Sequence, residues 1–224
     1  MKSEYLIFNL IVFSGPFALS FDKKVHFYRK WKQAFIAISI PLIPFVIWDA
    51  LVTHRHWWFN TEYTLDMRIA NLPPGEWLFF ITVPYACIFT WEVFVCYNIG
   101  NERLRWNLAP FLMLLFIPGI AFFAFGKEYT GLVLIALTFA TLLDKRLGTS
   151  IWQKKRILLF LALCTVFKLI FNGYLTARPV VLYGVEYQLD FRIFTIPVED
   201  FGYGFALLLS YIILLEKLKE VQHG

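Results

Sequence analysis

Charged residues are scarce in this sequence. Asp, Glu, Lys and Arg make up 17% of its 224 residues, whereas a soluble domain has roughly a quarter. Hydrophobic residues account for 59% and aromatic residues for 20%. A water-soluble fold cannot hide so much apolar surface, so the composition excludes an ordinary soluble domain and indicates an integral membrane protein.

Cysteines and nucleotide-binding motifs are also few or missing. Cys87, Cys96 and Cys164 all lie in apolar runs, without a metal-ligand spacing or a disulfide framework, and are interpreted as small core residues. Neither G-x-G-x-x-G nor a P-loop pattern occurs, so no nucleotide or flavin site is visible. His54 and His56 are too weak a signal for a metal, and we therefore expect no metal and no cofactor.

Long apolar runs, in contrast, fill most of the chain. Seven segments cover residues 5–21, 34–51, 77–97, 107–125, 129–143, 156–175 and 200–216. Most approach the ~20 residues that a helix needs to cross a bilayer, although the fifth is short. Helices are expected because an open strand in lipid would leave its backbone polar groups unpaired. The first segment lacks a small-residue cleavage site and is interpreted as a membrane helix rather than a signal peptide.

The chain also repeats itself at an offset of 124 residues. Residues 62–76 read EYTLDMRIANLPPGE, and residues 186–200 read EYQLDFRIFTIPVED. The matched pairs are Glu62 and Glu186, Tyr63 and Tyr187, Leu65 and Leu189, Asp66 and Asp190, Arg68 and Arg192, Ile69 and Ile193, Pro73 and Pro197, Glu76 and Asp200, and further on Glu92 and Glu216. A self-match of this density indicates an internal repeat.

The repeat extends beyond this motif and divides the chain. Tyr5 lies 124 residues before Tyr129, and Trp48-Asp49 in the second segment corresponds to Phe171-Asn172 in the sixth. We expect an all-α integral membrane fold with seven transmembrane helices. Residues 1–105 would form a first three-helix repeat, 106–126 a linking transmembrane helix and 127–224 a second three-helix repeat. With one helix between them, the two repeats cross in the same direction and are parallel.

Lysine and arginine are unevenly divided between the two sides that this layout defines. One side carries fourteen and the other six, and the rule that positive loops stay inside then places the C-terminus in the cytoplasm and the N-terminus outside. The motif loops 52–75 and 176–198 fall on the outer side of a multi-pass cell-membrane protein. The asymmetry explains the net charge of +5, favours the lipid bilayer as a partner and gives no support for nucleic acid.

The carboxylates that follow the repeated proline are the leading candidates for catalysis. Glu76 in the first copy, and Glu199 and Asp200 in the second, stand at the start of a membrane helix. An acid there can simply complement the helix dipole, but acids near a bilayer interior are expensive and usually functional. An apolar site would keep a proton on one of them and make it a general acid, whereas the helix N-terminus favours the anion.

Further polar side chains near these acids are predicted to support the site. They are Asp49, Asn172, Glu62, Arg68, Glu186, Arg192, Tyr63 and Tyr187. The two arginines either pair with acids of their own motif or position a motif carboxylate across the repeat interface. Asp49 and Asn172 either tie down the adjacent loop or take part in catalysis.

Other charged residues lie away from the motif. Glu92 and Glu216 are sixteen residues beyond the motif acids, about 24 Å along a helix. We expect them to pair with Arg103 or Lys219 and not to form a dyad with those acids. Lys168 lies inside the sixth segment and is expected to snorkel or to pair.

Both motif copies resemble a known family. The pattern E-Y-x-L-D-x-R-I-x-x-[LI]-P-x-x-[ED] is similar to the lycopene cyclase domain of bacterial, archaeal and fungal carotenoid biosynthesis, in its fused form. That family carries P-x-E-[ED] in each half. Residues 197–200 match this signature, whereas residues 73–76 have Gly75 in place of the first acid, which favours the 196–200 half as the catalytic one.

The resemblance implies an isomerase that cyclises the linear ends of lycopene, or of a related linear carotenoid, without net redox change. In this interpretation an acid protonates the terminal double bond, the neighbouring alkene closes a six-membered ring and a base removes a proton. Glu199 and Asp200 would supply the acid and the base, Glu76 would assist, and aromatic rings would stabilise the cation.

Two other classes remain open at this point. Small sugar transporters of the SWEET type also have three-plus-one-plus-three parallel repeats, but a transporter should place polar groups near the membrane midplane. The repeated acids here lie at helix ends, which favours an enzyme for an apolar substrate. A non-catalytic accessory membrane subunit is compatible with the altered first signature.

Overall fold

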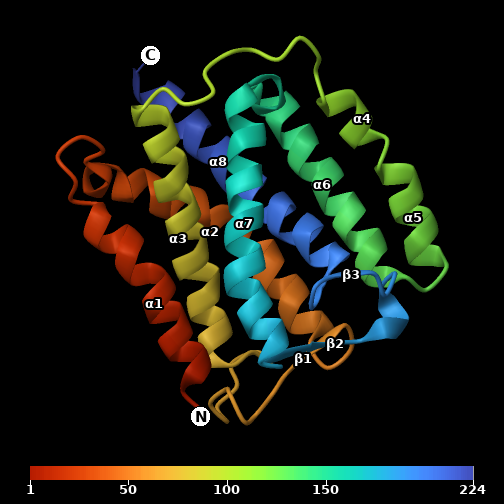
Figure 1. Ribbon diagram of the computed structural model, residues 1–224. Helices are drawn as coiled ribbons and strands as arrows, with labels where there is room; N and C mark the ends of the chain where they lie inside the picture. Colours follow the sequence, from red (N-terminus) through yellow and green to blue (C-terminus); the bar gives the residue numbers. More distant parts are fainter. Residues whose placement is uncertain (224) are drawn as a thin grey trace.

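The computed structural model describes residues 1–223, which are predominantly helical (Figure 1). The helices are α1 (Glu4–Leu19), α2 (Trp31–Val52), α3 (Pro74–Cys96), α4 (Ala109–Met113), α5 (Phe116–Ala124), α6 (Glu128–Leu147), α7 (Lys155–Ala177) and α8 (Val198–His223), with short 3-10 turns at Phe27–Lys30, Ile151–Gln153 and Val185–Tyr187. The strands are β1 (Trp57–Phe59), β2 (Val181–Tyr183), β3 (Arg192–Ile193) and β4 (Ile196–Pro197). The two chain ends lie at opposite ends of the molecule.

All seven apolar segments of the sequence are helical. Among the described residues, the helical stretches that are long and apolar enough to cross a membrane are Phe27–Val52, Pro74–Cys96, Lys155–Ala177 and Val198–Gln222. The stretches Glu4–Leu19 and Ala109–Ala124 are apolar but shorter. The chain is therefore a mostly helical protein with four helices suited to a membrane, against the seven spans expected from the sequence.

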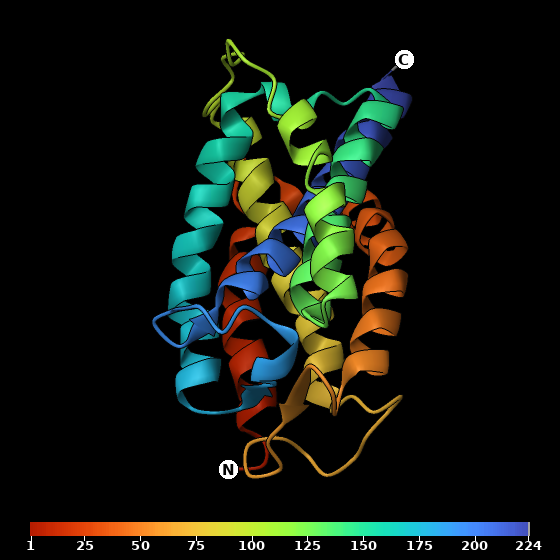
Figure 2. The same cartoon turned by 90° about the vertical axis from the view of Figure 1, so that its right-hand side faces the viewer.

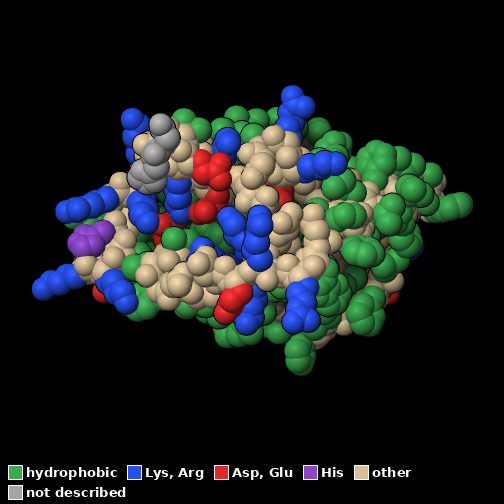
Figure 3. Space-filling view, turned by 90° about the horizontal axis from the view of Figure 1, so that it is seen from above, with side chains coloured by type: hydrophobic (Ala, Val, Ile, Leu, Met, Phe, Trp, Pro, Cys, Tyr) green, Lys and Arg blue, Asp and Glu red, His purple; other side chains and the backbone are tan. Residues whose placement is uncertain are grey.

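The linking segment is two short helices and not one continuous helix. α4 and α5 pack along α6, beside the second half of the chain (Figure 2). A Cβ atom on Gly131 of α6 would lie 2.6 Å from the carbonyl oxygen of Gly119 in α5, so the two backbones approach too closely for any side chain there. Seen from the end that holds the C-terminus, the surface over α4 and α5 is apolar, while Lys and Arg gather over the rest (Figure 3).

The remaining helices form two sets, the first half (α1–α3) and the second half (α6–α8). In each, the first helix packs along the third, α1 on α3 and α6 on α8. The middle helix α2 crosses to the other half and packs more extensively on α8 than on α3. The two halves are therefore interlocked, and the space between them is lined by both.

The two long loops pair with each other at the end that holds the N-terminus. β1 and β2 are antiparallel, with Trp57 opposite Tyr183 and Phe59 opposite Val181. β3 and β4 form a tight hairpin just before α8. The sequence predicted interfacial loops here and no strands, because strands of two or three residues have no periodicity to detect and β1 finds its partner far along the chain.

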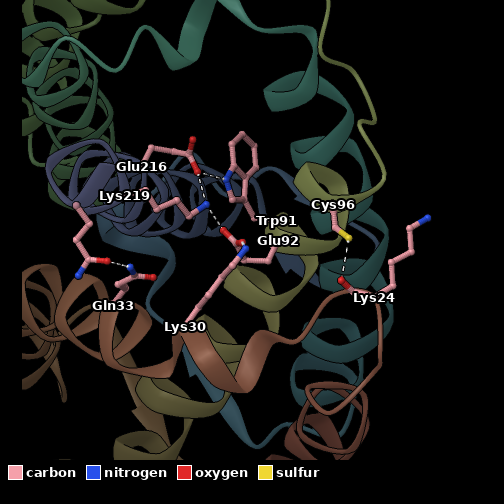
Figure 4. Close-up of polar contacts among 9 residues, drawn as sticks. Lys24, Lys30, Gln33, Trp91, Glu92, Cys96, Glu216 and Lys219 are labelled. Carbon is pink, nitrogen blue, oxygen red and sulfur yellow. Dashed lines mark hydrogen bonds and ion pairs between the residues drawn. The ribbon is translucent and has the colours of Figure 1, made fainter. Parts of the chain in front are cut away.

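An ion cluster joins α3 and α8 at the opposite end (Figure 4). Glu92 is fully buried and pairs with both Lys30 and Lys219. Lys219 also donates to Glu216 at 2.7 Å, and the indole of Trp91 donates to Glu216 at 2.9 Å. The expected pairing with Lys219 is therefore confirmed, and the two repeat-equivalent glutamates share one lysine.

Replacing Lys219 with methionine should lower the free energy of unfolding by up to about 3 kcal/mol, because buried Glu92 would keep only Lys30 as a partner. The matched control is Lys217→Met, two residues away, where an exposed pair with Glu220 is lost and the change should stay below about 1 kcal/mol. Thermal unfolding in detergent, followed by circular dichroism, measures both. Equal losses in the two variants would contradict the assignment.

Candidate active site

A small cavity lies between the two halves, at the end of the helices near the N-terminus. Its volume is about 60 Å³, enough for a few water molecules. The side chains that line it are Tyr5, Asp49, Trp57, Phe59, Glu76, Phe79, Tyr129, Lys168, Asn172, Leu175, Val181, Tyr183, Asp200 and Tyr203. Both halves and the β1–β2 ribbon contribute, so the cavity is a single shared space.

Asp200, in the first turn of α8, is buried and surrounded by donors. Its Oδ1 accepts from the hydroxyl of Tyr129 at 2.5 Å, and its Oδ2 accepts from the amide of Asn172 at 2.6 Å and the hydroxyl of Tyr183 at 2.8 Å. Lys168 Nζ lies 3.8 Å from Oδ2 and donates to the backbone carbonyl of Asp200 at 2.6 Å. This combination of donors and a cation stabilises a carboxylate anion.

Tyr183 is held in its protonated form by its surroundings. It lies in β2, outside the helices, where burial raises its pKa well above the usual value and the neighbouring Asp200 carboxylate raises it further. The phenol therefore stays a hydrogen-bond donor throughout the physiological pH range. Its ring also lies under the guanidinium of Arg192, 5.9 Å from the ring centre.

The acids of the first half have fewer partners. Glu76, in the first turn of α3, accepts from the hydroxyl of Tyr5 at 2.5 Å. Asp49, in the last turn of α2, accepts from the indole of Trp57 at 2.5 Å through Oδ1. Its other oxygen, Oδ2, is buried and has no hydrogen-bond partner among the described residues. Each of these acids thus has one donor where Asp200 has three.

The repeat found in the sequence is visible in these bonds. Tyr5 and Glu76 are 71 residues apart, and Tyr129 and Asp200 are also 71 residues apart and make the same contact. In each half a tyrosine at the start of the first helix binds an acid at the start of the third.

Gly75 explains the altered signature of the first half. A Cβ atom at this position would lie 2.6 Å from Cδ1 of Tyr5, so a side chain would displace the tyrosine from Glu76. The corresponding residue of the second half, Glu199, turns away from the cavity. Its Oε1 accepts from the hydroxyl of Thr130 at 2.6 Å and from the backbone N–H of Leu189 at 2.7 Å.

Aromatic rings form the wall of the cavity beside Asp49. The ring centres of Trp57 and Tyr129 are 5.1 Å apart, and Tyr203 lies 4.9 Å from Trp48 and 6.1 Å from Trp57. Electron-rich ring faces attract positive charge, most strongly where water is excluded. The cavity thus combines acids with ring faces that can stabilise a cation.

Several expected supporting residues lie outside the cavity and hold the loops. Arg68 donates to the carbonyls of Leu65 and Met67, and Arg192 donates to the carbonyl of Thr195 at 3.0 Å. Among the described residues neither arginine pairs with a motif carboxylate, contrary to expectation. The tight turns of both loops leave carbonyl groups in need of donors, and the arginines supply them.

The remaining members of that expected set also belong to the loops. The guanidinium of Arg178 lies over the ring of Tyr63, and that of Arg55 lies over the ring of Tyr187. The ring of His56 lies beside Tyr187 in a tilted arrangement. Glu62 is exposed, and the backbone carbonyl of Glu186 accepts from Lys127 at 3.2 Å. Of the supporting residues predicted from the sequence, Asp49 and Asn172 are the two that line the cavity.

The sequence interpretation overlooked several lining residues. Tyr5 and Tyr129 were recognisable as a repeated pair, and Lys168 stood out as a charge inside an apolar segment, which is a functional signal in itself. Trp57 and Tyr183 carried no such signal, because they reach the cavity only through the pairing of β1 with β2.

Fold and site together define a helical protein whose membrane-compatible helices enclose a cluster of acids and aromatic rings. The model of the lycopene cyclase family matches the chain twice, over residues 2–94 and 126–218. Both ends of the second match lie 124 residues beyond those of the first, which is the offset of the repeat. Because these matches cover most of the chain, the protein belongs to the lycopene cyclase family. No curated protein and no solved structure matches it.

Gly75→Ala should push Tyr5 away from Glu76 and reduce activity at least about tenfold, since a lost hydrogen bond to a charged or reacting group is worth about 1.5–3 kcal/mol. The matched control is Gly173→Ala in α7, where the added carbon would meet its nearest neighbour at an ordinary 3.9 Å. Pigment conversion in membranes measures both variants. A Gly75→Ala protein as active as Gly173→Ala would contradict the stated role of the glycine.

His56 makes the loop before β1 sensitive to acid. The side chain is buried, its Nε2 lies 3.1 Å from Glu128, and burial lowers the pKa of His56 below its usual value although Glu128 partly opposes this. The unfolded chain therefore takes up the proton first, and stability should fall as the pH drops below about 6.5.

The measurement is the unfolding temperature at about pH 7.5 and 5.5, values chosen on either side of the ordinary histidine pKa. His56→Gln should reduce the difference between the two temperatures. His54→Gln, at an exposed position in the same turn, should leave the difference as in the wild type. A wild-type response in the His56 variant would show that other groups cause the acid sensitivity.

Proposed function

We propose that this protein is a membrane-embedded cyclase that closes the ends of lycopene, or of a related linear carotenoid, into six-membered rings without net redox change. Membership of the lycopene cyclase family supports the substrate class. The observation that carries the proposal is the meeting of Asp49, Glu76 and Asp200 in one cavity walled by aromatic rings.

This chemistry needs an acid, a base and a surface that tolerates a carbocation. A protonated carboxyl adds a proton to the terminal double bond, and the tertiary cation is attacked by the neighbouring alkene to close the ring. A carboxylate then removes a proton and restores a double bond. Buried carboxyls can serve as acid and base at neutral pH because an apolar site changes their affinity for protons.

We assign the acid–base pair to Glu76 and Asp200, one from each half, with Asp49 as a third acid in the same cavity. Glu199 was expected from the sequence to share this work with Asp200. Its contacts with Thr130 and the backbone of Leu189 instead favour a role in holding the loop before β3 against α6. Trp57, Tyr129 and Tyr203 would stabilise the cation through their ring faces.

The proposed membrane arrangement follows the repeat. Residues 1–105 and 127–224 are two parallel three-helix units joined by residues 106–126, with the N-terminus and both motif loops outside and the C-terminus in the cytoplasm. The lysine and arginine asymmetry supports this orientation.

A cavity of about 60 Å³ is far smaller than the ~300 Å³ or more of a typical ligand pocket, so a carotenoid end group must widen it on entry. One shared cavity implies that one end is cyclised at a time.

The test is expression in cells that accumulate lycopene, followed by chromatography of the extracted pigments. Cyclic products are expected, and Asp200→Asn and Glu76→Gln should each lower their formation by about 100-fold or more, the usual effect of losing a general acid or base. Glu199→Gln should retain activity within about tenfold, since only a loop contact is weakened. Glu62→Gln, exposed in the same motif, is the matched control and should behave as the wild type.

Two results would contradict the proposal. Full activity in both Asp200→Asn and Glu76→Gln would remove the assigned pair. Unchanged lycopene in the presence of folded wild-type protein would favour a non-catalytic accessory subunit or a transporter.

A further inference from the structure

The two halves of the cavity differ in charge although they repeat one another. At the offset that aligns Asp49 with Asn172, the residue that corresponds to Lys168 is Phe45. The acid of the second half therefore faces an amide and an amine. Glu76, the corresponding acid of the first half, lines the cavity together with a second carboxyl of its own half, Asp49. This half has a phenyl ring at the lysine position.

Lys168 is placed to act on Asp200. Its side chain is 18% exposed, and Nζ is fixed by the 2.6 Å bond to the backbone carbonyl of Asp200 and lies 3.8 Å from Oδ2. Gly204, one turn along α8, makes room for the amine, because a Cβ atom there would lie 3.2 Å from Nζ. The ring of Phe201 lies 5.7 Å from Nζ, and Cys87 of α3 is the other titratable group that faces it.

A buried lysine inside an apolar helix is expensive unless its charge is compensated. Asp200 is the carboxylate within ion-pair distance, and its oxygens already accept from Tyr129, Asn172 and Tyr183. Asparagine cannot donate a proton to a carboxylate, and the Tyr183 phenol keeps its own. The groups in direct contact with Asp200 are thus donors and one positive charge, which together favour its ionised form. The carboxyls of Glu76 and Asp49 line the same cavity and oppose this, but neither makes a hydrogen bond to Asp200.

In the part of the chain that the structure describes, the acids of the first half have fewer hydrogen-bond donors than Asp200 and no cation as a partner. Among the described residues, no lysine or arginine pairs with Asp49 or Glu76, and each has a single donor. Two acids that line one cavity, neither with a described cation within ion-pair distance, cannot both be ionised at low energy, so they retain a proton between them. The unpartnered Oδ2 of Asp49 is an atom on which that proton can reside.

We infer that Lys168 is a positioning residue that, together with Asn172, keeps Asp200 ionised as the base, while Glu76 and Asp49 hold the proton that starts the reaction. This inference rests on the proposed cyclase function for its role in turnover. It divides the two tasks between the halves of the repeat: the first half supplies the acid, and the second half supplies the base.

The proton balance of one ring closure is then complete. The Glu76–Asp49 pair gives its proton to a terminal alkene carbon, where the π electrons form the new C–H bond and leave a tertiary cation. The π electrons of the neighbouring alkene form the ring bond and move the positive charge to the next carbon. Asp200 takes a proton from an adjacent carbon, whose C–H electrons become the ring double bond. Return of this proton from Asp200 across the cavity to the first-half pair resets the site.

The first test needs no substrate. Infrared spectroscopy of the detergent-solubilised protein detects the carbonyl stretch of protonated carboxyls. The wild type should show a band that Glu76→Gln or Asp49→Asn weakens and Asp200→Asn leaves unchanged. Lys168→Met should gain a further band that disappears in the Lys168→Met/Asp200→Asn double variant. A wild-type band that depends on Asp200 would overturn the inference.

The second test is turnover of lycopene in membranes as a function of pH. Lys168→Met should be at least about tenfold slower at neutral pH and should recover as the pH rises, because a nearby positive charge changes carboxyl ionisation by a factor of ten or more. Lys168→Arg should restore the wild-type profile. Lys168→Gln is measured in parallel, because its amide can still donate to the Asp200 carbonyl without a charge.

The control is Lys219→Met, which removes a partly buried lysine at the far end of the molecule. It should lower stability while keeping the wild-type pH profile. A Lys168→Met or Lys168→Gln profile identical to the wild type would also overturn the inference. The expected infrared bands in a wild-type protein that forms no cyclic product would instead refute the proposed function and leave the charge assignment standing.

Discussion

The structure depends on one constraint: a carboxyl group taken out of water must find hydrogen-bond partners inside the protein. Each half meets it in the same way, with a tyrosine from the start of its first helix bound to an acid at the start of its third. These bonds fix how α1 lies on α3 and how α6 lies on α8. Gly75 lacks a side chain for the same reason, since the ring of Tyr5 occupies the space.

The two halves of the chain, each matched by the family model, give their acids unequal surroundings. The second half surrounds its acid with an amide, two phenols and an amine, whereas the first half contributes two acids to the cavity, each with one donor. Unequal surroundings favour the proton on one particular acid and the charge on another. Two residues at equivalent positions of the two halves can therefore differ in protonation, so that one serves as an acid and the other as a base.

The two halves are held together at both ends of the helices. β1 and β2 join the long loops beside the cavity, and the shared Lys219 joins Glu92 with Glu216 at the other end. The β ribbon is built from three-residue strands, and Trp57, Phe59, Val181 and Tyr183 of these strands line the cavity.

The sequence by itself determined the helical segments, the offset of the repeat and the family, and it named Glu76, Glu199 and Asp200 as candidate acids, because hydropathy, self-similarity and motif spacing can be read along the chain. Only the tertiary structure decided that Glu199 turns away, that Arg68 and Arg192 hold loop carbonyls, and that Lys168 joins the site. Those outcomes depend on which groups meet across the packed helices and loops. A buried polar atom needs a hydrogen-bond partner, and that partner usually lies far away in the sequence, so no single stretch of sequence identifies it.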